Sequence, residues 1–336
     1  MTQDTATVRS RLWRDGKLEA EDFPFGRISD YLNEEGCLVW VDISDPESAD
    51  LSALADELSL DPLAVEDAIG QAERAKASRY ATHTFLTVYS VATSDEQNRD
   101  VSESCLSITR VSAFVMHRGI VTVRNGDEFD MDEVVQRWQE KAELLKYGPA
   151  ALVHGLLDVI VDAHFEAVQL LDDQIESLED QLFDDRAVNK QLQRLTYRVR
   201  KDLVQLRRVV LPMREVINTV LRHRQDVNAR PELDPWFEDL NDHVLRAAEW
   251  TESLRDMVTT VFETNLSLQD SRLNTVMKKL TSWAAIIAIP TAITGYFGQN
   301  VPYPGFGREW GFALSSAAII VIALGLYTIF KRRDWL

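Results

Sequence analysis

Hydrophobic residues are unevenly spaced along the 336-residue chain, and their spacing predicts different elements in different parts. In the first third, short apolar runs bounded by polar residues are typical of β-strands at 37–43, 82–92, 106–110 and 112–124. The spacing over 50–70 predicts two short helices, and that over 132–146 predicts another. We therefore expect a mixed α/β domain at 1–146.

Residues 147–234 are predicted to form an antiparallel pair of helices. The stretch 150–185 is rich in acids, the stretch 190–224 is rich in bases, and the polar run DDRAVNK lies between them. Opposite charges on consecutive helices favour a hairpin with ion pairs between its two arms. His154 and Asp158 are four residues apart, as some metal ligands are, but a transition-metal site needs more ligands than this pair supplies.

A long helical pattern follows this pair. It begins near Pro235 and contains no breaker until Pro290. An unbroken helix over 236–297 would be about 93 Å long at a rise of ~1.5 Å per residue. One of its sides is moderately apolar, while most of its acids are typical of a solvated face. We therefore predict a stalk helix at 235–280 that continues into the apolar end of the chain.

Two uncharged apolar segments dominate the C-terminal end. No charged residue occurs over 281–307, and none occurs over 311–330. A membrane-spanning helix needs roughly 20 apolar residues. We therefore predict elements with the following bounds: transmembrane helices at 281–300 and 311–330, a loop at 301–310 and a basic tail at 331–336. A helical hairpin buried in a soluble core is the alternative.

Basic residues beside the two segments predict their orientation. Lys278 and Lys279 precede the first segment, KRR follows the second, and the loop between them has a single Arg. The positive-inside rule places both chain ends in the cytoplasm and the loop outside. We therefore expect a two-helix protein of the cell (inner or plasma) membrane whose acidic body lies in the cytosol.

One face of the first segment carries small or weakly polar side chains at steps of three and four residues: Met277, Thr281, Ala284, Ala288, Thr291, Gly295 and Gly298. Small residues let membrane helices approach closely, so this stripe is interpreted either as a packing surface or as the lining of a narrow conduit. In the second interpretation Met277 and Leu280 form an apolar constriction at the cytosolic end. One helix cannot surround a conduit, so this interpretation requires a homo-oligomer.

Composition disfavours several classes of function. With 54 acidic and 36 basic residues, the net charge of −18 disfavours nucleic acid and suits a body surrounded by cations. Cys37 and Cys105 form no CxxC motif, which fits a reducing cytosol, and the N-terminus has no apolar signal core. The sequence contains no phosphate-binding glycine loop, GxSxG or HExxH motif. We therefore predict no enzyme activity and no organic cofactor.

Several short motifs occur in an order that resembles the CorA family of two-transmembrane divalent-cation transporters along nearly the whole chain. They are Trp40-Val41-Asp42, PLAVEDA at 62–68, LPMRE at 211–215, NTVMKKLT at 274–281, the Gly-x-Asn signature Gly298-Gln299-Asn300, and the ending KRRDWL. The resemblance implies a homopentamer that transports Mg²⁺. Its fold would be α+β, with an N-terminal α/β/α cytosolic domain, a long helical stalk and two C-terminal transmembrane helices.

The resemblance also assigns roles around the pore. The first membrane helix of each subunit would line it, with the signature Gly298, Gln299 and Asn300 at the mouth and these residues farther in: Gly295, Thr291, Ala288 and Ala284. Met277 and Leu280 would be the hydrophobic gate, beside a basic ring of Lys278 and Lys279. Mg²⁺ dehydrates reluctantly, so the Asn300 amide oxygens would bind its inner waters without removing them.

Cytosolic Mg²⁺ would also regulate the protein at sites between subunits. By motif position, Glu66 and Asp67 would face Asp239 of a neighbouring stalk. Facing acids repel one another unless a cation lies between them, so bound Mg²⁺ would stabilise the closed state. The alternative role for Asp67 is that of a helix cap.

Two features depart from the family pattern. Gln299 stands where methionine is usual, and the loop after the signature has Glu309, beside Arg308, as its only acid. We therefore expect weaker capture of cations outside the membrane. The transported ion stays open between Mg²⁺, with Co²⁺ or Ni²⁺, and the Zn²⁺ of a zinc transporter in the same superfamily. A membrane-anchored coiled-coil sensor that conducts nothing is the third hypothesis.

Overall fold

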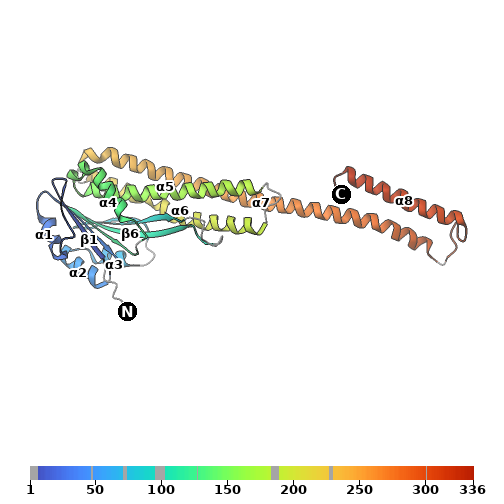
Figure 1. Ribbon diagram of the computed structural model, residues 1–336, viewed down its shortest axis with the longest axis horizontal. Helices are drawn as coiled ribbons and strands as arrows, with labels where there is room; N and C mark the ends of the chain where they lie inside the picture. The colour runs from blue at the N-terminus through green and yellow to red at the C-terminus, as the bar shows by residue number, and fades with distance from the viewer. Residues whose placement is uncertain are drawn as a thin grey trace. The chain divides into compact units, whose positions relative to one another are not determined.

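The computed structural model describes residues 7–46, 48–70, 74–94, 103–126, 128–182, 189–226, 230–299 and 301–336. The chain divides into two compact units, Met1–Val261 and Phe262–Leu336. The first unit contains a sheet with helices on both faces, and the second contains two apolar helical segments (Figure 1). The predicted α+β class is therefore confirmed.

A seven-stranded mixed sheet forms the centre of the first unit. Its strands are β1 (Thr7–Arg14), β2 (Lys17–Glu21), β3 (Cys37–Ser44), β4 (Lys76–Arg79), β5 (Thr84–Thr93), β6 (Leu106–Met116) and β7 (Gly119–Arg124). They lie in the order β2-β1-β3-β7-β6-β5-β4. Strands β3 and β7 are parallel, with Val41 opposite Val121, while the other described neighbours are antiparallel.

Helices cover both faces of the sheet because its central strands are apolar on both sides. All eight residues of β3 are buried, with Trp40 in one core and Val39 and Val41 in the other. One face is covered by α1 (Ile28–Asn33), α2 (Ser48–Leu58) and α3 (Pro62–Ile69). The other face is covered by α4 (Met131–Glu140), α5 (Pro149–Leu182), α6 (Asn189–Asp226) and the beginning of α7 (Asp234–Phe297) (Figure 1).

Helices α5 and α6 lie side by side, as predicted, and several of their ion pairs join them to other elements. Asp158 and Asp162 of α5 pair with Arg137 of α4, and Arg207 of α6 pairs with Glu252 of α7 at 2.6 Å. Both helices bury a row of leucine and valine side chains, so apolar packing holds this layer together. Most of the run DDRAVNK lies outside the described residues.

The predicted strands agree with the structure where the strands are buried. The predicted strand at 112–124 is wrong, because His117 and Arg118 form a turn that separates β6 from β7. The predicted break between 110 and 112 is also wrong, because β6 continues through it from Leu106. Strands β1, β2 and β4 were not predicted. Neither β2 nor β4 contains a buried residue, so neither shows the alternating pattern of a half-buried strand.

The second unit consists of the remainder of α7 and of α8 (Glu309–Arg332). Helix α7 is continuous through 64 residues although Pro290 lies inside it, as the long predicted helix requires. Helix α8 returns beside the last turns of α7 (Figure 1).

Candidate functional site

The stripe of small side chains lies on an open face of α7. Its members are exposed throughout: Met277, Thr281, Ala284, Ala288, Thr291, Gly295 and Gly298. Met277 and Leu280, the predicted constriction, have 57% and 62% of their surface exposed. Lys278 and Lys279 are exposed between them. A contiguous open row of this kind indicates a surface that lipid or another chain covers.

The opposite side of the same helix is partly covered, because α8 runs beside it (Figure 1). Partial burial recurs at Ile286, Ile289, Ile293 and Phe297. At about 100° per residue, this row lies roughly half a turn from the stripe of small side chains. Within the second unit, the two apolar helices therefore leave the stripe on the side away from their own contact.

The backbone along the stripe offers oxygen atoms. The Thr291 hydroxyl donates to the carbonyl of Ile287 at 3.1 Å, which leaves the lone pairs of its own oxygen available. Pro290 has no N–H, so the carbonyl of Ile286 lacks its usual helical donor. At the end of the helix, a Cβ added to Gly298 would lie 2.9 Å from the carbonyl oxygen of Thr294. The first signature residue is therefore a glycine for a steric reason.

The loop after α7 is held by aromatic contacts and a close backbone approach. Tyr303 donates to the carbonyl of Phe297 at 2.8 Å, and its ring lies between those of Phe297 and Phe306. Gly305 has a φ of +98°, which favours glycine. A Cβ added to Gly311 would overlap the Gly305 carbonyl. The loop therefore returns the chain to α8 in one closely fitted turn.

The signature itself is only partly within the described structure. The backbone N–H of Gln299 donates to the carbonyl of Tyr296 at 3.4 Å, and its side chain is exposed. Asn300 lies outside the described residues, so its predicted place at the mouth of a pore stays a prediction.

The three acids predicted to sense cations lie on the surface of the first unit. Asp67, in the last turn of α3, pairs with Lys76 of β4 at 2.8 Å, and Glu66 beside it is exposed. Asp239 of α7 has 67% of its side chain exposed and is 3.9 Å from His243. The described residues contain no group of three or more His, Cys, Asp or Glu side chains that would hold a metal ion. The predicted role of these three acids as a cation site between subunits therefore stays a prediction.

The alternative role of Asp67 as a helix cap does not hold. Asp61 is the N-cap of α3, and its carboxylate accepts the backbone N–H of Leu63 at 2.9 Å. His154 and Asp158, the spaced pair on α5, also have structural partners. His154 contacts the carbonyl of Trp236 at 3.1 Å, and burial lowers the pKa of its imidazole.

Sequence reasoning missed two parts of this arrangement. Lys76 was not recognised as the partner of Asp67, because β4 is too exposed to be predicted as a strand. The contacts among Phe297, Tyr303 and Phe306 were also missed, although the aromatic residues on both sides of the signature were a visible signal.

Both apolar helical segments have the length and composition to cross a membrane. The most apolar windows of the helices Pro231–Phe297 and Glu309–Arg332 have mean hydropathies of 1.4 and 2.2. Only 6% of the first window and none of the second is buried. A core helix of a soluble protein would be largely buried, so these two resemble membrane helices instead.

Comparisons with known proteins agree with this arrangement. A family model described as "CorA-like Mg2+ transporter protein" matches residues 35–332. The Cobalt/magnesium transport protein CorA of Thermotoga maritima is 28% identical over 300 residues, 88% of this chain and 83% of that protein. The Zinc transport protein ZntB of Yersinia enterocolitica is 25% identical over 318 residues, 90% of this chain and 89% of that protein. The solved CorA magnesium transporter of Methanocaldococcus jannaschii has the same fold, with a TM-score of 0.76, 21% identity and 99% of each chain covered.

Proposed function

The chain belongs to the CorA-like Mg²⁺ transporter family of divalent metal transporters, and from this premise we propose that it forms a pore for hydrated Mg²⁺. The open stripe of α7 would line this pore, and α8 would form an outer layer against lipid. The chain would be a membrane protein with both ends in the cytoplasm, as its basic flanks favour.

The observation that carries this proposal is the position of the stripe relative to α8. The covered side of α7 has large aliphatic residues, while the row directly opposite has small residues and threonines; Trp283, Ile287 and Tyr296 are exposed between these two rows. A single packing surface would place the small residues against α8, because small residues let helices approach. The opposite placement supports a surface shared among several copies of the chain. Five copies, the number that the family resemblance implies, would enclose a narrow conduit.

The side chains along this conduit suit a hydrated ion. Mg²⁺ exchanges its inner waters reluctantly, so a ring of neutral Asn300 amides would bind the water shell at the entrance. Gly298 and Gln299 would form the same entrance. Farther in, the Thr291 hydroxyl and the Gly295 backbone would offer further oxygens, while Ala288 and Ala284 keep the passage wide enough for waters.

The inner end of the conduit would be the gate. Met277 and Leu280 are large, apolar and exposed in the single chain, so a ring of each would narrow the conduit. An apolar constriction can stop ions by excluding water. Lys278 and Lys279 would form a basic ring at the same level and repel cations when the gate is closed.

Cytosolic cations would regulate this gate from the first unit. Glu66 and Asp67 of one chain would face Asp239 of the next, and Mg²⁺ between them would remove their mutual repulsion. Asp67 already has Lys76 as a partner, so binding of the cation would compete with this ion pair. Subunits with bound magnesium would favour the closed state of the pore, and loss of this magnesium would allow the pore to open.

Zinc is the second candidate cargo, because a protein named as a zinc transporter is among the relatives. The mouth leaves the cargo open, since Gln299 stands where the family resemblance implies methionine and the loop has a single acid, Glu309. Ion-resolved uptake into proteoliposomes, with Mg²⁺ and Zn²⁺ compared at several pH values, separates the two. If Zn²⁺ uptake were faster than Mg²⁺ uptake and depended on a proton gradient, zinc and not magnesium would be the transported ion.

Asn300→Ala tests the pore directly. We expect this variant to lose nearly all Mg²⁺ flux while the oligomer stays assembled on size exclusion, because the entrance loses its ring of amides. Asn33→Ala, which removes an exposed amide from α1, is the matched control and should transport normally. Normal flux in Asn300→Ala would remove Asn300 from the mouth. If substitutions along the stripe were also tolerated, the non-conducting sensor would be favoured.

A further inference from the structure

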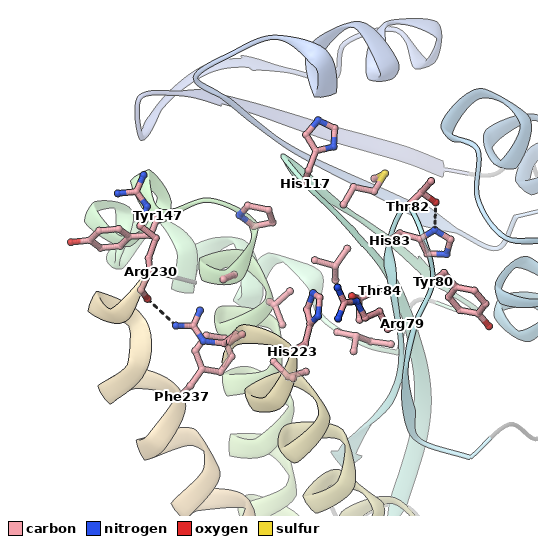
Figure 2. A pocket seen from close by; sticks show the side chains of 18 of the residues that line it. Arg79, Tyr80, Thr82, His83, Thr84, His117, Tyr147, His223, Arg230 and Phe237 are labelled. Carbon is pink, nitrogen blue, oxygen red and sulfur yellow. Dashed lines mark hydrogen bonds between the residues drawn. The ribbon is translucent and has the colours of Figure 1, made fainter. Parts of the chain in front are cut away.

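A cavity of about 470 Å³ lies in the first unit, between the ends of the sheet strands and the helical layer (Figure 2). It is lined by the β4–β5 turn, the β6–β7 turn, the first turn of α5, the last turn of α6 and the start of α7. This volume is typical of sites for small molecules, roughly 300–1,000 Å³. None of the residues given a role above is among the described residues that line it.

The wall of this cavity is cationic, in a chain whose net charge is −18. Arg79, Arg224 and Arg230 line it together with three histidines, and its described lining contains no Asp or Glu. Figure 2 shows Arg79 and His223 next to each other. Burial, followed by the charge of Arg79, lowers the pKa of His223. Burial opposes a charge of either sign on His223, and Asp226, which pairs with Arg79 at 3.7 Å, acts against the effect of that arginine. The positive character of the wall therefore rests on its arginines.

Arg224 gives an independent indication of an anion site. It is 7% exposed, and its Nη2 donates to the carbonyl of Arg230 at 3.0 Å and to Asp234 at 2.7 Å. Its Nε and Nη1 are also buried, and neither has an acceptor among the described residues. The ring of Phe237 lies 4.5 Å from the guanidinium carbon and helps to hold the group in place. Buried charged donors without acceptors are costly, so oxygens of a bound anion would stabilise this arrangement.

The beginning of α5 adds a second anion-binding element. This helix has 34 residues and starts at Pro149, which lines the cavity together with Ala150 and Val153 of the same turn. The first turn of a long helix carries partial positive charge, which favours an anion. Because the backbone N–H of Ala151 donates to the carbonyl of Gly148 at 3.0 Å, this turn contributes mainly that partial charge. Proline at the first position removes a donor that the helix does not use.

The remainder of the wall is apolar, with Leu86, Val115, Val153, Val220 and Phe237 facing the cavity. Inorganic phosphate alone would leave this surface uncovered, and a neutral apolar molecule would leave the donors of Arg224 without acceptors. We propose that the cavity binds a small organic anion, with its phosphate or carboxylate at Arg224 and the first turn of α5 and its apolar body against the aliphatic wall. This site is separate from the cation pathway and does not depend on it.

Calorimetric titration of the purified full-length protein tests whether the ligand needs both its anionic group and its apolar body. The probes are phenyl phosphate, inorganic phosphate and benzyl alcohol. We expect one phenyl phosphate per chain, bound at least about tenfold more tightly than inorganic phosphate, because the cavity also buries the ring. Benzyl alcohol should bind more weakly than phenyl phosphate by a similar factor. Equal affinity for phosphate and phenyl phosphate, or no binding of phenyl phosphate, would overturn the proposal.

Two matched substitutions place the binding in this cavity. Arg224→Gln should weaken phenyl phosphate about tenfold or more, since it removes the charged donor. Arg222→Gln removes the same charge two residues away, on a side chain that is 69% exposed and outside the lining, and should have no effect.

Ala81→Trp provides a test that does not disturb Arg224. Ala81 lines the cavity and is exposed, so we expect a tryptophan there to occupy part of the cavity without altering its charges. This variant should lose phenyl phosphate binding even if Arg224→Gln fails to fold. Undiminished binding in Ala81→Trp would refute the site. The proposed pore is tested separately, by the cation flux of Asn300→Ala. Loss or retention of phenyl phosphate binding therefore does not decide whether the chain transports Mg²⁺.

Discussion

Replacing Gly311 with alanine should disturb the proposed pore mouth through a single atom. The new Cβ would overlap the carbonyl oxygen of Gly305 and lie 3.0 Å from its carbonyl carbon. That carbonyl cannot retreat freely, because it also accepts the N–H of Arg308 at 3.1 Å. The loop must therefore move away from α8. Overpacking of this kind costs about 1–3 kcal/mol.

Gly325→Ala is the matched control, since the same substitution on the same helix meets no atom within 4 Å. Both variants gain helix propensity, so their difference isolates the steric cost. We expect Gly311→Ala to have a lower midpoint of thermal unfolding, by at least about 2 °C, and a reduced Mg²⁺ flux in proteoliposomes. Equal midpoints and equal flux in the two variants would refute the close fit between the loop and α8.

Two further predictions concern the first unit. Asp239→Lys should keep Mg²⁺ flux high when the internal magnesium concentration is high. Glu238→Lys, which changes the neighbouring exposed acid, should still be inhibited by internal magnesium. Normal inhibition of Asp239→Lys would remove Asp239 from regulation. Burial lowers the pKa of His164 from 6.5 to about 4, and its Nε2 contacts the carbonyl of Tyr89 at 2.7 Å. Between these pKa values the unfolded chain binds a proton that the folded chain excludes, so stability falls by up to about 1.4 kcal/mol per pH unit as pH drops from 6.5 to 4. His164→Gln should flatten that part of the unfolding profile, and an unchanged slope would contradict the assignment.

The parts of the fold that follow from sequence are those with a local periodic pattern. Strand β3 is apolar at most positions, and α7 contains no breaker over more than fifty residues before Pro290, so neighbouring residues alone predicted both. Strands β2 and β4 have no such pattern because they contain no buried residue. The turn at His117 was missed for a related reason: the strands on both sides of it have the same apolar character.

Candidate residues divide in the same way. The stripe on α7 and the signature at 298–300 were visible as spacing and as a motif. The partner of Asp67 was not, because Lys76 reaches it from a different element. The donors of Arg224 looked like ordinary charges near the end of a helix. Their proposed role in binding an anion depends on the cavity that Arg224 lines together with residues of the sheet and of α5, which are distant in the sequence.

The sequence by itself determined the two apolar segments, the continuous helix that leads into the first of them, and the small residues along one of its faces. Each of these properties depends on residues within a few turns of one another. The tertiary structure decided that α8 covers the other face of α7, that Asp61 rather than Asp67 caps α3, and that arginines gather around a cavity in an acidic chain. The physical reason is that burial and pairing depend on contacts between residues distant in the chain, which local spacing does not encode.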